Sequence, residues 1–173
     1  MLTEKQKKWI SHLDSNNKIH IIPYNPETKK IFNIIKNDLI KVLGKTTISH
    51  RGSTKLKISG QGEIDLYIPV TNKKFKLYLY KLIKYIGKPR SLYDLERARF
   101  IKYINNIKIE IFLINKNCEG WKNCIKFEKY LKENSKALNE YIKVKNKVNG
   151  LSTRRYYAAK TEFINKILDL TIK

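Results

Sequence analysis

Residues 63–70 read Glu-Ile-Asp-Leu-Tyr-Ile-Pro-Val, and this alternation of polar and apolar side chains indicates the fold class. The side chains of a β-strand point alternately to its two faces, so the aliphatic residues share one face while Glu63 and Asp65 share the other. Pro69 closes the run, because proline cannot donate a ladder hydrogen bond. The stretch therefore predicts a half-buried strand whose polar face carries two carboxylates at backbone positions about 7 Å apart.

The segments around this strand predict helices and further strands in mixed order. The predicted helices are residues 3–16, 31–43, 72–86 and three pieces from residue 118 to the end, and the predicted strands are 19–24, 46–49, 98–104 and 107–114. Gly44 is suited to cap the second helix, and Asn105-Asn106 is suited to a two-residue hairpin turn. The order predicts an α+β (mixed α/β) fold, with a mixed β-sheet flanked by helices and a helical C-terminal portion.

The chain has 173 residues, a length at which one core can bury about 70% of the unfolded surface. No internal repeat or long low-complexity linker divides it, so we expect a single domain over residues 1–173. Within it, residues 1–17 would be an N-terminal helical extension, residues 18–116 the α/β core, and residues 117–173 C-terminal helices packed on that core.

The composition is that of a folded, strongly basic protein, with 42% hydrophobic residues and a net charge of +22. Of the 37 basic residues 31 are lysine, which an AT-rich coding sequence would also produce. The charge therefore indicates either RNA as a partner or a lysine-rich solvated surface. No apolar run approaches the roughly 18 to 20 residues that cross a bilayer, the N-terminus lacks a signal-peptide pattern, and two cysteines build no disulfide framework. We expect a cytoplasmic protein with no membrane partner, and a monomer is favoured.

Two further features would bring phosphate-binding and acidic groups to the polar face of residues 63–70. A Gly52-Ser53 turn lies about ten residues upstream, and its backbone N–H groups suit a triphosphate because Gly52 has no Cβ. Glu110 supplies a third carboxylate on the polar face of a later strand. Three gathered carboxylates repel by about 4 kcal/mol per pair at 4 Å and an effective dielectric near 20, unless a cation neutralises them. The pattern favours a Mg²⁺ or Mn²⁺ site; the alternative is an exposed strand whose acidic residues are merely solvated.

Several motifs carry a family resemblance. They are Ile19-His20-Ile21-Ile22-Pro23-Tyr24-Asn25-Pro26, His50-Arg51-Gly52-Ser53-Thr54, Glu63-Ile64-Asp65, Phe127-Glu128-Lys129-Tyr130-Leu131, Tyr141 with Lys145, and Tyr157-Ala158-Ala159-Lys160 with Phe163-Ile164. In this order they resemble the GrpB-like family, a branch of the polymerase-β-type nucleotidyltransferase superfamily, over residues 19–168. The chain departs from the family at residues 55–62, a loop about one residue shorter and without Pro-Gly. It also departs at residues 107–111, Ile-Lys-Ile-Glu-Ile, where many members have a His-x-His pattern.

The resemblance implies a divalent-metal-dependent nucleotidyltransferase that moves a nucleoside monophosphate from an NTP to an unidentified hydroxyl-type acceptor by a two-metal mechanism. Glu63 and Asp65 would bind Mg²⁺ (or Mn²⁺), and Glu110 would complete the metal site and help to deprotonate the acceptor. The nucleotide-binding candidates are Gly52, Ser53, Thr54, His50, Arg97, Arg99, Tyr157 and Lys160.

Some of these candidates have structural alternatives. His50 would equally serve as a hydrogen-bonding residue at the end of a strand. Arg97 and Arg99 would alternatively lie on a solvated strand edge, and Tyr157 would alternatively pack in the core. The rival functional hypothesis is a catalytically inactive module of the same fold that binds RNA or a protein partner through its basic surface. The family's fusions indicate a third, a helper domain beside a coenzyme A biosynthetic kinase. Glu110 favours the enzyme, since an inactive scaffold has no reason to keep a third carboxylate.

Overall fold

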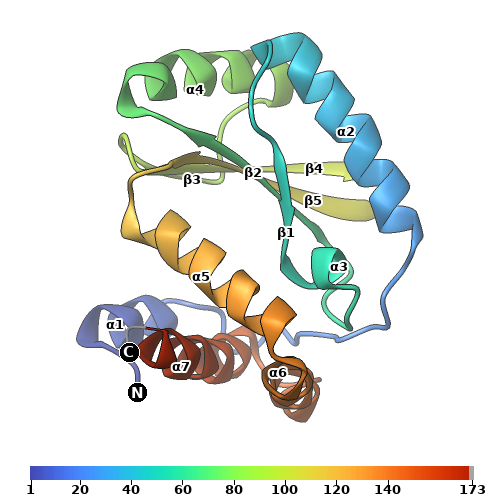
Figure 1. The fold of residues 1–173 in the computed structure, drawn as a ribbon, viewed down its shortest axis with the longest axis vertical. Helices are drawn as coiled ribbons and strands as arrows, with labels where there is room; N and C mark the ends of the chain where they lie inside the picture. The colour runs from blue at the N-terminus through green and yellow to red at the C-terminus, as the bar shows by residue number, and fades with distance from the viewer. Residues whose placement is uncertain (172–173) are drawn as a thin grey trace. The chain divides into compact units, whose positions relative to one another are not determined.

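The computed structural model describes residues 1–171, which form two compact units (Figure 1). The α/β unit consists of residues 24–58 and 62–122, and the helical unit consists of residues 1–23, 59–61 and the described chain from residue 123 onward. Among the described residues, no helix is long and apolar enough to cross a membrane. The single domain with C-terminal helices packed on the core stays a prediction.

The α/β unit is built on one five-stranded mixed sheet. Its elements are α2 (Glu27–Leu43), β1 (Ser49–Arg51), α3 (Gly52–Leu56), β2 (Ile64–Val70), α4 (Asn72–Ile86), β3 (Ser91–Tyr93), β4 (Arg97–Ile104) and β5 (Ile107–Asn115). The strand order is β1-β2-β5-β4-β3, in which β2 and β5 are parallel and the other neighbours are antiparallel. The mixed sheet with its helices confirms the predicted α+β class.

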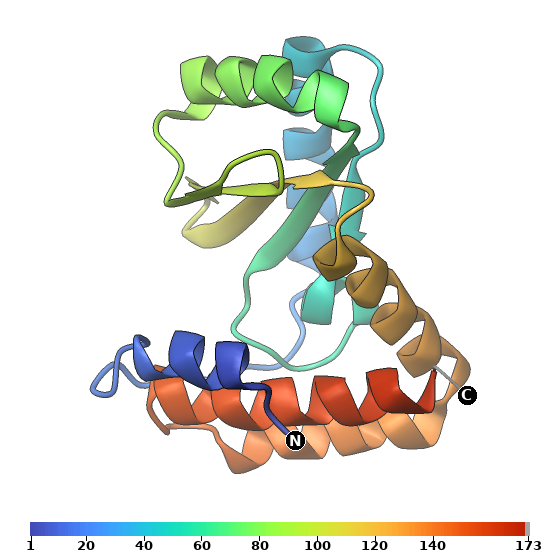
Figure 2. The same ribbon diagram turned by 90° about the vertical axis from the view of Figure 1, so that its left-hand side faces the viewer.

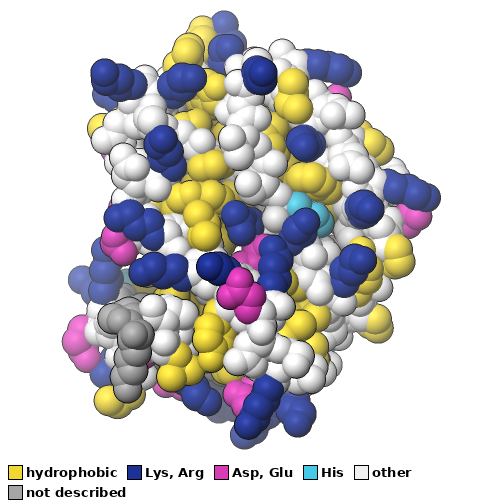
Figure 3. All heavy atoms as spheres, viewed as in Figure 1, with side chains coloured by type: hydrophobic (Ala, Val, Ile, Leu, Met, Phe, Trp, Pro, Cys, Tyr) yellow, Lys and Arg dark blue, Asp and Glu magenta, His cyan; other side chains and the backbone are white. Residues whose placement is uncertain are grey.

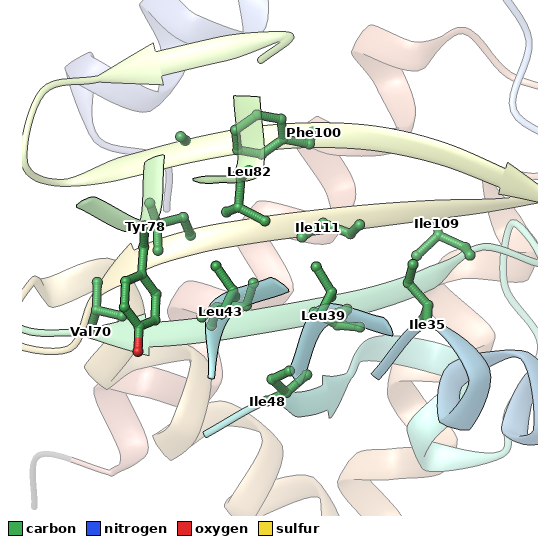
Figure 4. Packing of buried hydrophobic residues seen from close by; sticks show 14 of the residues in the cluster. Ile35, Leu39, Leu43, Ile48, Val70, Tyr78, Leu82, Phe100, Ile109 and Ile111 are labelled. Carbon is green, nitrogen blue, oxygen red and sulfur yellow. The ribbon is translucent and has the colours of Figure 1, made fainter. Parts of the chain in front are cut away.

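Helices α2 and α4 cover one face of the sheet (Figures 1 and 2). In α2, Ile35, Leu39 and Leu43 recur every four residues, which places them on one side of the helix. The side chains of Ile35 and Leu39 are fully buried, and they lie with Ile109 and Ile111 of β5 in the same core (Figure 4). The face of β2 and β5 that carries aliphatic residues is therefore the face that these helices cover.

Strands β4 and β5 form the hairpin that the sequence predicts. Asn105 and Asn106 have φ angles of 50° and 62°, which lie in the left-handed region. A two-residue type I′ turn requires this conformation at both positions, and asparagine tolerates it better than most residues. The ladder begins at the pair Ile104 and Ile107, directly beside the turn. The hairpin and its turn are confirmed.

The helical unit contains the predicted C-terminal helices. Its helices are α1 (Glu4–Ser11), α5 (Glu119–Glu133), α6 (Ser135–Lys147) and α7 (Thr153–Leu170), and the boundary with the α/β unit falls within α5. The side chains of Asn134 and Ser152 cap the N-termini of α6 and α7. The sequence predicts breaks at residues 134–135 and 149–150. The first cap lies at its break and the second lies two residues beyond its break, because Asn and Ser satisfy the N–H groups that a helix start leaves unpaired.

The first 24 residues of the chain differ from the prediction. Helix α1 ends at Ser11 rather than near residue 16, and the Asp14 carboxylate instead accepts hydrogen bonds from the backbone of Asn16 and Asn17. Residues 19–24 form no strand in the described part of the chain, where isolated bridges join Lys18 to Ser152 and Ile22 to Gly60.

Three local boundaries in the α/β unit also differ. Strand β1 covers Ser49–Arg51 rather than residues 46–49, and the residues predicted as a turn and loop begin with the short helix α3. Strand β3 was not predicted, because its three residues are held by pairing with β4 rather than by a local pattern.

The core predicts an unequal response from two neighbouring residues of α2. Leu39 is fully buried and Ile40 is 36% exposed. Leu39→Ala should lower the free energy of unfolding by about 2 to 5 kcal/mol, because it leaves a cavity against the sheet, whereas Ile40→Ala should cost under about 1 kcal/mol. Urea unfolding followed by circular dichroism measures both, and equal losses would contradict this assignment of the core.

Candidate metal-binding site

Three carboxylates converge on the sheet face opposite α2 and α4. Asp65 on β2 and Glu110 on β5 are directly paired in the parallel register, and Glu63 lies two residues before Asp65, on the same side of the chain. One carboxylate oxygen from each of the three residues lies within 4.8 Å of the others. The structure therefore brings together the three residues that the sequence selected for metal binding.

Two basic side chains hold this acidic cluster. The Lys108 Nζ lies 2.7 Å from Glu110 Oε1 and 2.8 Å from Glu63 Oε2, and the Arg99 Nη1 lies 3.2 Å from the same Glu110 oxygen. Burial alone would lower the pKa of Lys108, but its hydrogen bonds to Glu110 and Glu63 outweigh that penalty and raise the pKa above its usual value. Lys108 is therefore a fixed positive charge at neutral pH.

Lys108 is the residue of this cluster to which sequence reasoning gave no role. It shares a face of β5 with Glu110, since the two are separated by one residue. That spacing was visible in the sequence, but lysine is so abundant in this chain that one more lysine carried no signal. Its contact with Glu63 depends on the pairing of β2 with β5, which links residues far apart in the sequence.

Gly52 lies directly against the cluster. An added Cβ at this position would lie 2.0 Å from Asp65 Oδ2, a distance that no pair of non-bonded atoms tolerates. Gly52 also has a φ angle of 75°, which disfavours any residue with a side chain. Glycine is thus required here twice, by backbone conformation and by the close approach of the carboxylate.

His50 and Thr54 have structural partners within the same unit. The Thr54 hydroxyl donates to the backbone oxygen of Glu63 at 3.3 Å, so His50 Nε2, 2.9 Å away, is the donor to Thr54 Oγ1. The His50 ring also stacks on Phe32 of α2 at 4.5 Å between ring centroids. These contacts fix α3, which begins with Gly52 and Ser53, beside the start of β2. A role of His50 and Thr54 in nucleotide binding stays a prediction.

The remaining candidates divide between the two units. Arg97 lies on the same strand as Arg99, with its guanidinium carbon 5.0 Å from the centroid of the Tyr93 ring; its buried Nε has no hydrogen-bond partner among the described residues. Tyr157 and Lys160 belong to α7 of the helical unit, where the Lys160 Nζ lies 5.5 Å from the centroid of the Tyr157 ring. Tyr157 packs against a buried cluster of that unit, and its binding role stays a prediction.

An aromatic group that the sequence did not single out continues the acidic face. Tyr67 of β2 stacks on Phe112 of β5 at 4.6 Å between centroids, and Trp121 lies 5.6 Å from Tyr67. The guanidinium carbon of Arg51 lies 5.0 Å from the centroid of the Trp121 ring. Phe112 and Trp121 are buried, so this part of the sheet face is packed rather than solvated.

The donor set of the acidic cluster fits a hard divalent cation. Carboxylate oxygens are the ligands that Mg²⁺ and Mn²⁺ prefer, and three of them can be brought onto one ion from their present spacing. Glu110 is only 6% exposed, so its charge requires a cation nearby, which Lys108 and Arg99 already supply in part. The residues present can therefore hold such an ion.

The contact between Gly52 and Asp65 predicts a specific effect of one added methyl group. Gly52→Ala should destabilise the protein by more than about 1 kcal/mol, from strain at positive φ together with the clash against Asp65. Gly44→Ala is the matched control, because Gly44 has a φ of 84° with no atom within 4 Å of the added Cβ. Thermal unfolding of both variants measures the difference. An equal loss of stability in Gly52→Ala and Gly44→Ala would mean that the Asp65 carboxylate does not limit the space beside Gly52.

Comparisons with known proteins agree with this fold. The family model described as GrpB protein matches residues 18–170. The crystal structure of the conserved protein GrpB from Enterococcus faecalis superimposes with a TM-score of 0.67 at 17% sequence identity, over 88% of this chain and 99% of that chain. No curated protein matches the chain. Because the family model covers most of its length, the chain belongs to the GrpB family, which has a nucleotidyltransferase-like fold.

Proposed function

We propose that this protein is a divalent-metal-dependent nucleotidyltransferase, which transfers a nucleoside monophosphate from an NTP to a hydroxyl-type acceptor. The observation that carries the proposal is the convergence of Glu63, Asp65 and Glu110 within 4.8 Å. Gathering three carboxylates in one place raises the free energy of the folded protein, unless cations nearby neutralise their charge. Membership of a family with a nucleotidyltransferase-like fold supports the same reaction class.

The proposed roles follow from the positions of the side chains. A bound Mg²⁺ or Mn²⁺ would neutralise charge on the triphosphate and lower the pKa of an acceptor hydroxyl. Asp65 would hold the ion from β2, where the ladder to β5 fixes its backbone, and Glu63 would hold it from the position just before that strand begins. Glu110, on the neighbouring strand, would complete the ligand set and accept the proton of the acceptor hydroxyl.

The nucleotide would meet the chain at the start of α3. Gly52 leaves room beside Asp65 that any side chain would fill, and Ser53 adds a hydroxyl next to it. Arg99 of β4 forms an ion pair with Glu110, so its side chain lies on the same face of the sheet as that carboxylate. Arg97 lies two residues before Arg99 on β4 and therefore faces the same side. Forked guanidinium groups are suited to bind phosphate oxygens.

The proposal predicts loss of transfer when one metal-binding carboxylate becomes an amide. The protein is incubated with each labelled NTP and Mg²⁺ or Mn²⁺, with total RNA or lysate as the source of acceptor. Asp65→Asn should lower transfer by about a hundredfold or more, because a neutral amide is a weaker ligand than a carboxylate for the metal ion that would stabilise the charge of the transition state. It should also weaken metal-dependent nucleotide binding by calorimetry, with an unchanged circular dichroism spectrum.

Asp38→Asn is the matched control for that experiment. Asp38 lies on α2 and pairs with Lys41, with a side chain 37% exposed, so the same chemical change there should leave transfer intact. Nucleotide affinity that is equal in the presence of excess chelator, or full transfer by Asp65→Asn, would contradict the proposal.

A second candidate function is favoured by the charge. With a net charge of +22, the chain attracts polyanions whatever its catalytic state, so a binding module for RNA or a protein partner is the alternative. Figure 3 displays Lys and Arg side chains dispersed over the visible face rather than gathered in one stripe. A nucleic-acid groove usually concentrates its basic residues, whereas on the face drawn in Figure 3 they are dispersed.

A salt titration separates the two functions. A module with six or more phosphate contacts should lose about a thousandfold in RNA affinity between 50 and 200 mM salt, and Asp65→Asn should not alter this loss. For the enzyme we expect weak RNA binding at physiological salt together with transfer that disappears in Asp65→Asn. Filter binding of RNA and the transfer assay, run on the same protein samples, distinguish the module from the enzyme. Tight, salt-sensitive RNA binding without transfer to any acceptor would favour the module.

A further inference from the structure

Strand β4 contributes four side chains to the face of the sheet that carries the acidic cluster. Arg99 shows this orientation through its ion pair with Glu110. Lys102 lies on the opposite face, where its Nζ is 4.7 Å from the centroid of the Tyr85 ring of α4. Side chains two residues apart on a strand share a face. The side chains of β4 on the face of the cluster are therefore those of Arg97, Arg99, Ile101 and Tyr103.

The chemical character of these four side chains changes along β4. The first two are guanidinium groups, the third is aliphatic and the fourth is aromatic. In the antiparallel ladder Ile101 is the partner of Glu110, and Tyr103 is the partner of Lys108. Directly paired residues have Cβ atoms about 4.5 to 5.5 Å apart. An aliphatic and an aromatic side chain therefore border the carboxylate cluster on the side of β4.

Tyr103 stands at the end of a row of residues that crosses the sheet. The register of β2 with β5, extended by one residue, places Glu63 beside Lys108, and their 2.8 Å ion pair agrees with this position. Tyr103 follows on β4 as the ladder partner of Lys108. The start of α3 lies on the other side of the cluster, where Gly52 is in close contact with Asp65. A ligand that extends from α3 past the carboxylates would therefore meet Tyr103.

The ring of Tyr103 is accessible to a ligand. Tyr103 is 63% exposed, the largest value for an aromatic residue in the described chain, and no stacking or cation–π contact of its ring occurs within residues 1–171. By contrast, the ring of Tyr157 makes edge contacts with the rings of Trp9 and Tyr156. A single exposed aromatic residue is common on protein surfaces, so its position beside the carboxylates is the informative feature.

We propose that Tyr103 binds the nucleobase of the nucleoside triphosphate by stacking, with Ile101 as an apolar contact beside it. The inference rests on the proposed function, which places the triphosphate at the start of α3 and the metal ion at the carboxylates. A nucleotide bound in this order extends its nucleoside over β5 and β4. An aromatic side chain stacks on any base, because every base has a π-face.

Calorimetry with two kinds of ligand separates the base from the phosphates. The full chain is titrated with Mg²⁺ present, using the α,β-methylene analogues of the four ribonucleoside triphosphates, and inorganic tripolyphosphate, which has no nucleoside. Tyr103→Ala should lower the affinity for the tightest-binding analogue about tenfold, as expected for the loss of one base–aromatic stack. The affinity for tripolyphosphate should stay unchanged. Tyr103→Phe keeps the ring and should bind both ligands as the wild type does.

Tyr80→Ala is the matched control for the loss of an exposed aromatic ring. Tyr80 is 55% exposed and lies on α4, which covers the opposite face of the sheet. Both affinities should stay at the wild-type value in this variant. A loss of nucleotide affinity as large as that in Tyr103→Ala would overturn the specific role of Tyr103.

The outcomes separate this inference from the proposed function. Unchanged nucleotide affinity in Tyr103→Ala, or an equal loss for tripolyphosphate, would overturn the role of Tyr103 while leaving metal-dependent nucleotide binding in place. A loss in Tyr103→Phe as large as that in Tyr103→Ala would also overturn it, because the ring would not be the group that binds. Tyr103→Leu, which has no ring, replaces Tyr103→Ala if that variant fails to fold. Absence of Mg²⁺-dependent binding of every ligand to the wild type would overturn the proposed function, and the inference with it.

Discussion

The parallel pairing of β2 with β5 is the constraint on which the rest of the site depends. In this register Asp65 is opposite Glu110 and Leu66 is opposite Ile111. Because side chains alternate along a strand, one pair faces the acidic cluster and the other faces α2 and α4. A slip of β2 by one residue would place the Asp65 carboxylate under the helices and turn Leu66 to the opposite face. Burial of the apolar face therefore fixes the geometry of the acidic face.

The sheet also supplies the charges that make this geometry tolerable. A carboxylate as buried as Glu110 costs several kcal/mol when it is left without a partner. Arg99 reaches it from β4 on one side, and Lys108 reaches it along β5 itself. The stacked rings of Tyr67 and Phe112 lie beside the cluster on the same face and keep part of it away from solvent. The apolar neighbours thereby strengthen the ion pairs that the carboxylates require.

The sequence was most informative where a pattern is local. Helices α2 and α4 follow from apolar residues at helical spacing, and the β4–β5 hairpin follows from alternation around Asn105 and Asn106. The selection of the three carboxylates followed from period-two alternation on two strands, together with the resemblance of Glu63-Ile64-Asp65 to a family motif. Their approach to one another is read from the structure, since no local pattern pairs β2 with β5.

Features that depend on distant partners were missed. Residues 19–24 have strand-like composition, yet with no strand beside them they form only isolated bridges. Strand β3 lacks a pattern of its own and exists through β4. The contact of Lys108 with Glu63 combines two distant segments, and the abundance of lysine hid it. The physical reason is the same in each case: pairing energy comes from a partner that single-sequence periodicity does not identify.

Lys108 and Glu110 are best understood as a coupled pair of residues. Adding Glu110 to a site that already contains Glu63 and Asp65 raises the repulsion among carboxylates, which falls only slowly with distance in a poorly solvated cluster. A lysine two residues earlier on the same strand points to the same face and neutralises that added charge without any change elsewhere in the fold. Glu110 without Lys108 would add to the repulsion among the carboxylates, and Lys108 would lose one of its two carboxylate partners without Glu110. Their joint presence on β5 therefore places a carboxylate and the cation that neutralises it on one strand.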